Sequence, residues 1–196
     1  FQELAGLYLE ERERAGFDLM DFVDAHFSEP GGKAASFETD TSRDMYSHIS
    51  ARWDILGRGP DTANPNSSRI PLPYPYIVPG GRFKEIYYWD SYFTMIGLVS
   101  DGRMDIARNM LANFGHLIDS VGFIPNGNRD YYLSRYQPPF FTMMVSLVNE
   151  NDKSTEERYF AQIEKEYASW MKGSDFLDKG NATSRGGRGG ETLCRG

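Results

Sequence analysis

The sequence predicts an all-α protein. Apolar side chains recur at helical spacing in four successive segments between residues 90 and 173, and almost no stretch alternates as a strand does. The connections between these segments are alternately short and long, as in antiparallel helical hairpins whose long loops gather at one end. A hydrophobic content of 40% over 196 residues is enough for one sizeable core in one or two domains.

The first third of the chain predicts shorter elements. Residues 2–27 predict two helical pieces, and the charged run over residues 10–14 predicts a solvated helix face. A polar, turn-rich stretch over residues 28–44 follows, and residues 46–53 then have one short helical stripe of apolar side chains.

Residues 57–79 are dominated by chain-breaking residues. Most of the chain's ten prolines lie here, which argues against any regular element. Four apolar side chains, Tyr74, Tyr76, Ile77 and Val78, are too many for a free tether. We therefore expect a loop that packs against the body of the protein and delivers the next segment to a site.

Each of the four helices from residue 90 onward has its own boundary signal. The first follows Asp90, the second occupies residues 103–121, and Pro138-Pro139 can open the third. The fourth begins at the capping-box pattern of residues 154–157 and ends near Gly173. The methionine and aromatic stripes of these helices, which include Phe93, Ile96, Phe160 and Tyr167, are expected to pack in the core.

The last residues differ from the rest. Residues 178–196 contain six glycines and three arginines but few apolar side chains, so they cannot bury a core. We expect two parts: a helical domain over residues 1–177, and a Gly/Arg-rich tail over residues 178–196 that is disordered or read out of frame.

Charge and composition exclude several function classes. The net charge is -7 with no basic block, so no nucleic-acid partner is predicted. The apolar stretches are short and interrupted, so no membrane span is predicted. Cys194 is the single cysteine, and His26, His48 and His116 have no ligand partner at useful spacing. No metal site and no cofactor are therefore predicted.

The segment Pro79–Tyr92 contains the most chemistry. It has one arginine, two carboxylates and five aromatic rings within fourteen residues, directly after a Gly-Gly pair. Aromatic faces cover the C–H faces of a sugar, while arginine and carboxylate groups form directed hydrogen bonds with its hydroxyls. The composition of this segment thus suits a neutral, hydroxyl-rich ligand.

Three segments together resemble the trehalases, the glycosidases that split α,α-trehalose into two glucoses. Pro79–Tyr92 meets every fixed position of the family pattern P-G-G-R-F-x-E-x-Y-x-W-D-x-Y. Residues 122–129 resemble the I-P-N-G-N-R segment, and residues 131–140 resemble the Y-Y-L-x-R-x-Q-P-P run. The segments stand in family order across residues 74–150, whereas residues 178–196 show no resemblance.

The resemblance implies a fold, a substrate and a set of contacts. The fold would be an (α/α) toroid of six helical hairpins, of which this chain is the N-terminal part, and the substrate would be trehalose. Two side chains, Phe83 and Tyr87, would line the pocket. The side chains implied to contact the disaccharide are Arg82, Trp89, Asp90, Asn126, Arg135 and Gln137.

Structural interpretations of the same residues stay open at this point. Asp90 could cap a helix, Asn126 with the following glycine could form an ordinary turn, and Gln137 could be a loop residue without a role. Arg82 and Arg135 could form surface ion pairs. Tyr136 replaces the small serine that is usual in the family, and its ring could point away or could crowd the pocket.

No catalytic residue is assigned within the chain. Glycoside hydrolysis needs a carboxylic acid and a second carboxylate, which activates water in an inverting enzyme. Glu85 and Asp90 are five residues apart, which does not place them on one helix face, and Glu85 is better explained as the structural partner of an arginine. The resemblance places the acid and the base further along the chain. The fragment alone should therefore bind trehalose weakly or not at all and release no glucose.

Two other functions stay open. One is a non-catalytic carbohydrate-binding protein derived from a trehalase, and the other is a helical-toroid glycosidase that acts on a different disaccharide. The compartment is also open between periplasm and cytoplasm, with the periplasm slightly favoured. A partial ring leaves helix faces uncovered, which favours aggregation.

Overall fold

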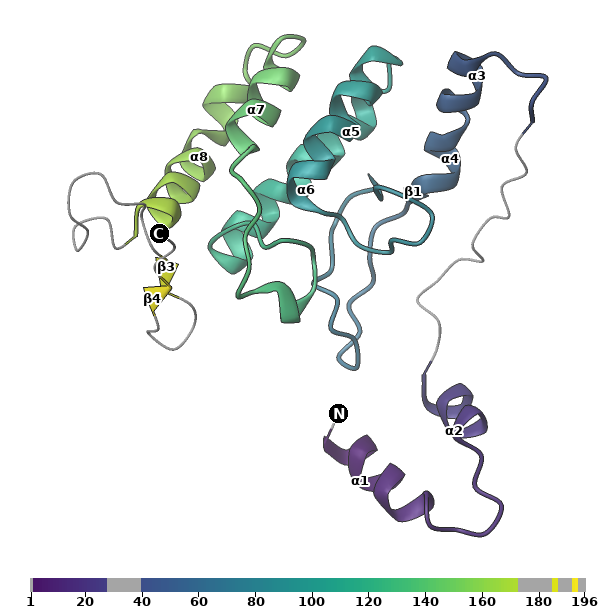
Figure 1. Cartoon of the computed structure of the whole chain (residues 1–196). Coiled ribbons are helices and arrows are strands. Elements are labelled where there is room, and N and C mark those ends of the chain that lie inside the picture. The colour runs from purple at the N-terminus through teal and green to yellow at the C-terminus, as the bar shows by residue number, and fades with distance from the viewer. Residues whose placement is uncertain (1, 28–39, 173–184, 187–191, 194–196) are drawn as a thin grey trace. The chain divides into compact units, whose positions relative to one another are not determined.

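The computed structural model describes residues 2–27, 40–172, 185–186 and 192–193 (Figure 1). The chain divides into two compact units, Phe1–Thr39 and Asp40–Gly196, which are described separately below. The expected domain boundary at residue 177 lies outside the described residues and stays a prediction.

The first unit consists of two short helices, as the sequence predicts. They are α1 (Gln2–Glu11) and α2 (Leu19–His26), and Asp18 caps α2 by accepting hydrogen bonds from the N–H groups of Met20 and Asp21 at 2.7 and 3.1 Å. The rings of Tyr8 and Phe22 pack edge to face, with centroids 5.7 Å apart. The charged run is largely solvated, but it leaves the helix at residue 11 and continues into a turn.

The second unit begins with two helical turns and a pair of minimal strands. The stripe over residues 46–53 forms α3 (Met45–Ser50) and α4 (Arg52–Leu56). Strand β1 (Gly57–Arg58) pairs antiparallel with β2 (Tyr76–Ile77), so that Gly57 lies opposite Ile77. The expectation of no regular element over residues 57–79 is therefore wrong at both ends. Five of the prolines lie between these strands, and the strand residues themselves keep their N–H groups for pairing.

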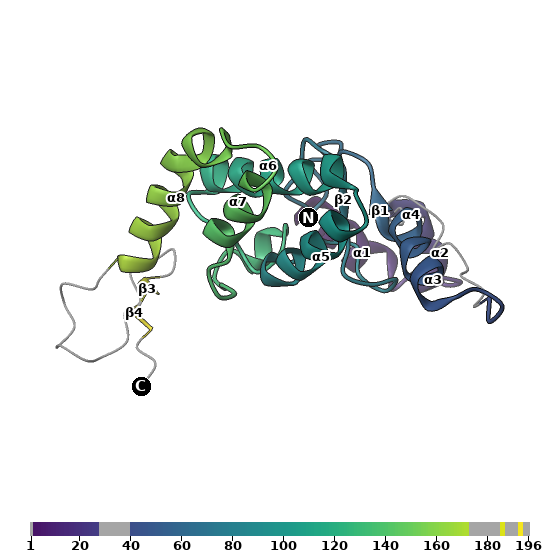
Figure 2. The same cartoon turned by 90° about the horizontal axis from the view of Figure 1, so that it is seen from above.

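The four long helices form as predicted. They are α5 (Tyr88–Ser100), α6 (Met104–Val121), α7 (Phe141–Asn149) and α8 (Thr155–Met171). Helix α5 contacts α6, and α7 contacts α8, which gives two antiparallel hairpins. Contacts of α6 with α7 and α8, and of α5 with α7, place the hairpins side by side in two layers (Figures 1 and 2). The long connection between α6 and α7 includes the 3₁₀ turn η1 (Asp130–Tyr132).

Three predicted helix starts are wrong in detail. Helix α5 begins at Tyr88 and so contains Asp90, which it was expected to follow. Pro138-Pro139 precedes α7 instead of opening it, because the helix begins only at Phe141. At α8 the predicted capping box does not form. Ser154 has helical backbone angles, and its hydroxyl donates to Asp152 Oδ1 at 2.7 Å and accepts from no backbone N–H of the helix.

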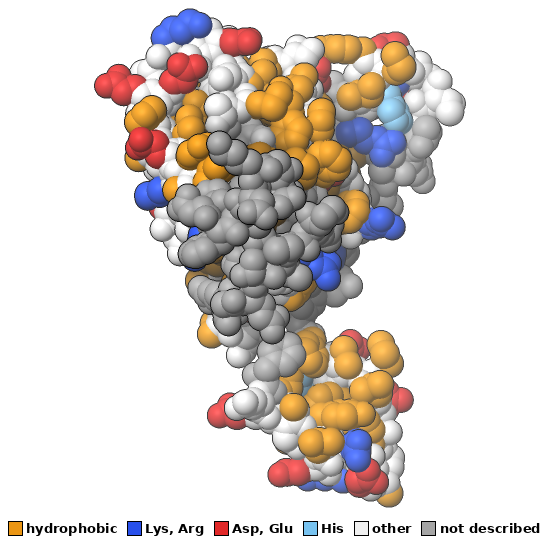
Figure 3. Space-filling model, turned by 60° about the vertical axis from the view of Figure 1, so that its left-hand side comes forward, with side chains coloured by type: hydrophobic (Ala, Val, Ile, Leu, Met, Phe, Trp, Pro, Cys, Tyr) orange, Lys and Arg blue, Asp and Glu red, His pale blue; other side chains and the backbone are white. Residues whose placement is uncertain are grey.

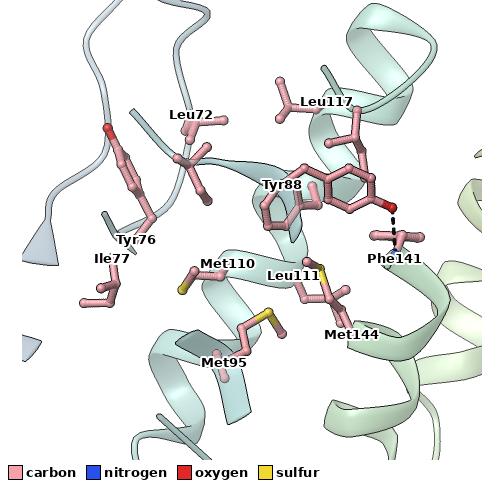
Figure 4. Packing of buried hydrophobic residues seen from close by; sticks show 14 of the residues in the cluster. Leu72, Tyr76, Ile77, Tyr88, Met95, Met110, Leu111, Leu117, Phe141 and Met144 are labelled. Atoms are coloured by element: carbon pink, nitrogen blue, oxygen red, sulfur yellow. Dashed lines mark hydrogen bonds between the residues drawn. The ribbon is translucent and has the colours of Figure 1, made fainter. Parts of the chain in front are cut away.

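The core of the second unit lies among α5, α6, α7 and the segment around β2 (Figure 4). It confirms the packed loop, since Tyr76, Ile77 and Val78 are buried, although Tyr74 is 45% exposed. The labelled side chains in Figure 4 come from all of these elements: Leu72, Tyr76, Ile77, Tyr88, Met95, Met110, Leu111, Leu117, Phe141 and Met144.

Parts of the predicted core are exposed instead. Phe93 is 56% exposed and Ile96 41%, and on α8 Phe160 and Tyr167 are 58% and 66% exposed. Figure 3 shows hydrophobic side chains grouped on one face of this unit. The expectation that these stripes are core is wrong for these four residues, because no described element covers the helix faces on which they lie.

Two further points concern membrane spans and the tail. Within the described ranges, no helix combines the length and hydrophobicity that a membrane crossing requires.

Strand β3 (Arg185–Gly186) pairs antiparallel with β4 (Thr192–Leu193). The remainder of the predicted tail lies outside the described residues.

Candidate functional site

Backbone hydrogen bonds bring the three sequence segments together. The Tyr88 N–H donates to the carbonyl of Asn126 at 3.3 Å, and the Asn126 N–H donates to the carbonyl of Arg135 at 3.1 Å. Tyr87 also forms an antiparallel bridge with Gly127. The backbone of Asn126 therefore joins the other two segments, so this residue is not only part of a local turn.

Glycine at position 127 permits a close approach between two segments. A Cβ atom there would lie 3.1 Å from the carbonyl oxygen of Ile86 and 3.2 Å from the ring of Tyr132. A side chain at this position would therefore force the first segment or the loop after α6 to move by a few tenths of an ångström.

Gln137 links the start of α5 to the segment before α7. Its Oε1 accepts from the Trp89 N–H at 2.9 Å, and its Nε2 donates to Asp90 Oδ2 at 3.2 Å. The amide thus caps an N–H group that the helix cannot satisfy itself. The interpretation of Asp90 as the cap is wrong, because Tyr87 is the N-cap residue and Asp90 lies in the first turn, where a negative charge is favourable.

Trp89 lies in a cluster of aromatic rings and keeps one part open. Its side chain is 42% exposed, and its ring centroid is 6.3 Å from those of Phe93 and Phe140. Tyr92 packs on Phe140 at 5.0 Å and so supports the cluster from the next position. Phe140 has no signal in the sequence that marks it as part of this cluster, because only the fold brings it beside Trp89.

A second aromatic group lies around Tyr87. The Phe83 ring packs on Tyr87 with centroids 5.3 Å apart, and the guanidinium of Arg82 lies 4.8 Å from the Phe83 centroid. The hydroxyl groups of Tyr87 and Tyr132 are 3.2 Å apart, and burial raises the pKa of Tyr87. Phe83, Tyr87 and Arg82 thus form one continuous surface.

Two of the expected sugar-contacting residues are arginines that lie at the surface. Arg82 and Arg135 are both exposed, and neither forms an ion pair within the part of the chain that the structure describes. The interpretation as surface ion-pair residues is therefore wrong for the described structure. Guanidinium groups in this state can donate to hydroxyl oxygens.

Glu85 has the structural role that the sequence favours. Its Oε1 accepts from Arg129 Nε at 2.7 Å, and both side chains are largely buried. Its Oε2 accepts from the Lys84 N–H at 3.2 Å and from the Tyr87 hydroxyl at 3.4 Å. Both oxygens are engaged within the protein, so Glu85 is not free to act on a ligand.

Asn128 joins the proline-rich loop to the site. Its Oδ1 accepts from the Ile86 N–H at 3.0 Å, and its Nδ2 donates to the carbonyl of Ile70 at 3.0 Å. Asp61 anchors the same loop through Arg69 at 3.0 Å and the Tyr76 hydroxyl at 3.1 Å. No sequence motif marks these anchors, whose partners lie 42 and 58 residues away for Asn128 and 8 and 15 residues away for Asp61.

Tyr136, the departure from the family pattern, lies against α8. Its ring centroid is 4.9 Å from Phe123 and 5.1 Å from Trp170, and its hydroxyl lies 3.1 Å from Ser169 Oγ. Its neighbour Gln137 contacts the start of α5 instead. The two adjacent side chains therefore contact different helices.

The described residues hold no group of three His, Cys, Asp or Glu side chains that could bind a metal ion. A cavity of about 640 Å³ lies between the start of α7 and α8. Its lining includes Pro139, Thr142, Glu166 and Trp170, but none of the eight side chains that the family resemblance places at the sugar. The eight side chains are therefore not part of the lining of this cavity.

Comparison with known proteins identifies the family. The trehalase family model matches residues 8–188, which includes the start of the segment 178–196 that sequence analysis found unlike the family. A periplasmic trehalase of Xanthomonas campestris pv. campestris (strain B100) is 51% identical over 177 residues, covering 89% of this chain and 31% of the relative. A periplasmic trehalase of Pseudomonas aeruginosa (strain PAO1) is 52% identical over 168 residues, covering 85% and 31%.

A solved structure agrees with these relatives. Neutral trehalase Nth1 from Saccharomyces cerevisiae superposes with a TM-score of 0.52 at 32% identity, covering 74% of this chain and 29% of that protein. The chain spans about a third of the length of the curated relatives. The all-α class and the hairpins of a partial (α/α) toroid are thereby confirmed. The chain belongs to the trehalase family.

Proposed function

We propose that this chain forms the sugar-binding wall of a trehalase that hydrolyses α,α-trehalose to two glucose molecules. The observation that supports this most is the convergence of the three segments, in which Gln137 bonds both to the Trp89 N–H and to Asp90. Family membership and relatives that are named trehalases support the choice of substrate.

Each wall residue has a chemical task in this proposal. Trp89 offers its open face to the C–H face of one glucose unit, held in place by Phe93 and Phe140. Asp90 and Gln137 accept from and donate to adjacent sugar hydroxyls, since each keeps polar capacity beyond their mutual bond.

The remaining wall residues complete the set of donors. Asn126 contributes a side-chain amide, and Arg82 and Arg135 contribute guanidinium forks for hydroxyl oxygens. Phe83 and Tyr87 line the same surface. Many directed hydrogen bonds with one aromatic platform are what a neutral disaccharide requires.

The acid and the base of the reaction are proposed to come from outside this chain. An inverting glycosidase uses one carboxylic acid to protonate the leaving oxygen and one carboxylate to activate water. Glu85 cannot take either role, because Arg129 and Tyr87 occupy its oxygens. Asp90 alone would not complete a pair, so the chain binds but does not cleave.

We also propose the periplasm as the compartment of this protein. The support is the printed name of the relatives, which are periplasmic trehalases at 51% and 52% identity. Fractionation of the source cells, with detection by an antibody against this chain, tests the proposal. A purely cytoplasmic signal would refute it.

Titration of the isotope-labelled chain with trehalose, followed by NMR, tests the wall. We expect weak, saturable shifts at the Trp89 indole and the Gln137 side-chain amide, with no glucose released. Asp90→Asn should weaken the binding, whereas Asp105→Asn, an exposed carboxylate on α6, should not. Unchanged spectra at the highest trehalose concentration would refute the assignment, and steady glucose release would refute the absence of catalytic groups.

The same titration separates the alternatives. Tight binding by a monodisperse chain would favour a non-catalytic carbohydrate-binding protein. Stronger shifts with maltose or sucrose than with trehalose would favour a different disaccharide.

A further inference from the structure

Helix α8 contains a buried carboxyl group with no role in the wall described above. Glu166 is only 5% exposed, and burial raises the pKa of its carboxyl to about 7 although a hydrogen bond from Tyr88 opposes this rise. Its Oε1 accepts a hydrogen bond from the hydroxyl of Tyr88, which lies 78 residues earlier in the sequence. A buried carboxyl needs such a partner, but the partner here belongs to the first segment of the wall.

The Tyr88 hydroxyl has a complete set of hydrogen bonds. Its oxygen accepts from the N–H groups of Phe140 and Phe141, both at 2.8 Å, so both lone pairs are taken. Its proton then has one direction left, which is toward Glu166. Tyr88 itself is buried, so no water can replace a missing partner at low cost.

The two N–H groups belong to the start of α7. A helix cannot satisfy its first N–H groups internally, and Tyr88 satisfies one at the first residue of α7 and one immediately before it. Gln137 stands only three residues before Phe140, in the same short stretch that includes the two prolines. The hydroxyl therefore fixes the stretch in which Gln137 lies.

Gln137 in turn caps the start of α5, at the residue that follows Tyr88. The result is a closed circuit: Tyr88 holds the start of α7, and Gln137 just before α7 holds Trp89 and Asp90 on α5. Glu166 is the only member of the circuit on α8, and it determines the orientation of the Tyr88 O–H bond.

We propose, resting on the proposed function above, that Glu166 is a positioning residue for the sugar wall. It acts through the Tyr88 hydroxyl, which keeps Gln137 against Trp89 and Asp90. Its own carboxyl needs no contact with sugar for this role.

Amide hydrogen exchange of the chain without sugar tests the circuit. The reporters are the N–H groups of Trp89, Phe140 and Phe141, measured relative to that of Leu111 inside α6. Glu166→Leu removes the acceptor of the Tyr88 hydroxyl. Exchange at all three reporters should then be at least about tenfold faster relative to Leu111, because the reporters exchange through a local opening that leaves α6 closed.

Three further variants separate positioning from general stability. Glu166→Gln offers a neutral acceptor to the Tyr88 proton and should keep most of the protection. Tyr88→Phe should lose as much protection from exchange at the three reporters as Glu166→Leu does. Glu164→Gln, an exposed neighbour that lines the same cavity, should behave as the wild type.

Two results would overturn the proposal. One is wild-type exchange at all three reporters in both Glu166→Leu and Tyr88→Phe. The other is an equal acceleration at the reporters and at Leu111, which would mean that Glu166 serves only global stability. If Glu166→Leu does not fold, Glu166→Gln is compared with Tyr88→Phe instead. Faster exchange at the three reporters in Tyr88→Phe supports the proposal, and equal exchange in the two variants refutes it.

A trehalose titration of the same samples keeps the two proposals distinguishable. If the circuit behaves as expected and trehalose also shifts Trp89 and Gln137, both proposals are supported, and Glu166→Leu should weaken that binding. If the circuit behaves as expected but trehalose shifts neither residue in the wild type, the link from Glu166 to Gln137 holds and the sugar assignment is refuted.

Discussion

Replacement of Glu166 by glutamine should remove a specific pH dependence of stability. In the folded chain the carboxyl has a pKa of about 7, against an ordinary value of 4.5. Because the folded state keeps the proton that the unfolded state gives up, stability from this group is full below pH 4.5 and is lost as the pH rises toward 7.

The size of the effect follows from the two pKa values. A shift of one in pKa corresponds to about 1.4 kcal/mol, so the rise from 4.5 to about 7 corresponds to about 3 kcal/mol in the free energy of unfolding. Most of this loss, about 2.5 kcal/mol, falls between about pH 5 and about pH 8. Glu166 is 5% exposed, so solvent screening reduces the value little.

Urea denaturation followed by circular dichroism measures this difference. The free energy of unfolding is determined at about pH 5 and about pH 8 for the wild type and for Glu166→Gln, and the two pH differences are subtracted. The subtraction should give about 2.5 kcal/mol, because all other titrating groups are common to both proteins. Glu157→Gln, an exposed change on the same helix, serves as the control and should leave the wild-type pH difference. Equal pH differences in the wild type and in Glu166→Gln would refute the reasoning.

Three other changes have expected outcomes from the same structure. Glu85→Gln breaks the buried pair with Arg129 and should cost about 3 to 5 kcal/mol in the free energy of unfolding, measured by urea denaturation; a cost below about 1 kcal/mol would contradict a buried pair. Gly127→Ala should cost about 1 to 3 kcal/mol in the same assay through its collision with the Ile86 carbonyl, and the open position Gly81 should accept alanine without such a cost. Phe93→Ser should reduce self-association in sedimentation velocity, because the ring is 56% exposed on an uncovered face; unchanged association would exclude that face as its cause.

Periodicity predicted the helices well but not which of their apolar residues are buried. Met95 and Leu98 are fully buried on α5, while Phe93 and Ile96 on the same helix are exposed. All four are apolar, and the sequence pattern shows only that the segment is helical. Burial depends on which elements cover each face, and this is a property of the tertiary structure.

The site residues were predictable only through the family resemblance. Gln137 has no local signal, because its two partners on α5 lie 47 and 48 residues earlier in the sequence. The local sequence around Glu166 is misleading, because the residue follows Lys165 in a polar stretch that is typical of a helix face exposed to solvent. Only the packing of Tyr88 beside α8 shows that this carboxyl is buried.

The contacts of Asn128 have a consequence for the order of folding. Its amide joins Ile70 and Ile86, which are 58 and 42 residues away along the chain. Closing such loops is slow compared with forming the local hydrogen bonds of α6. The wall should therefore be assembled late, on hairpins that have already formed. Pulse-labelled hydrogen exchange should find the Ile70 and Ile86 amides protected after those of α6, and simultaneous protection would rule out this order. A surface that forms last can also open while the rest of the structure stays folded. A bound sugar should therefore slow the opening of this surface more than it slows the unfolding of the helices beneath it.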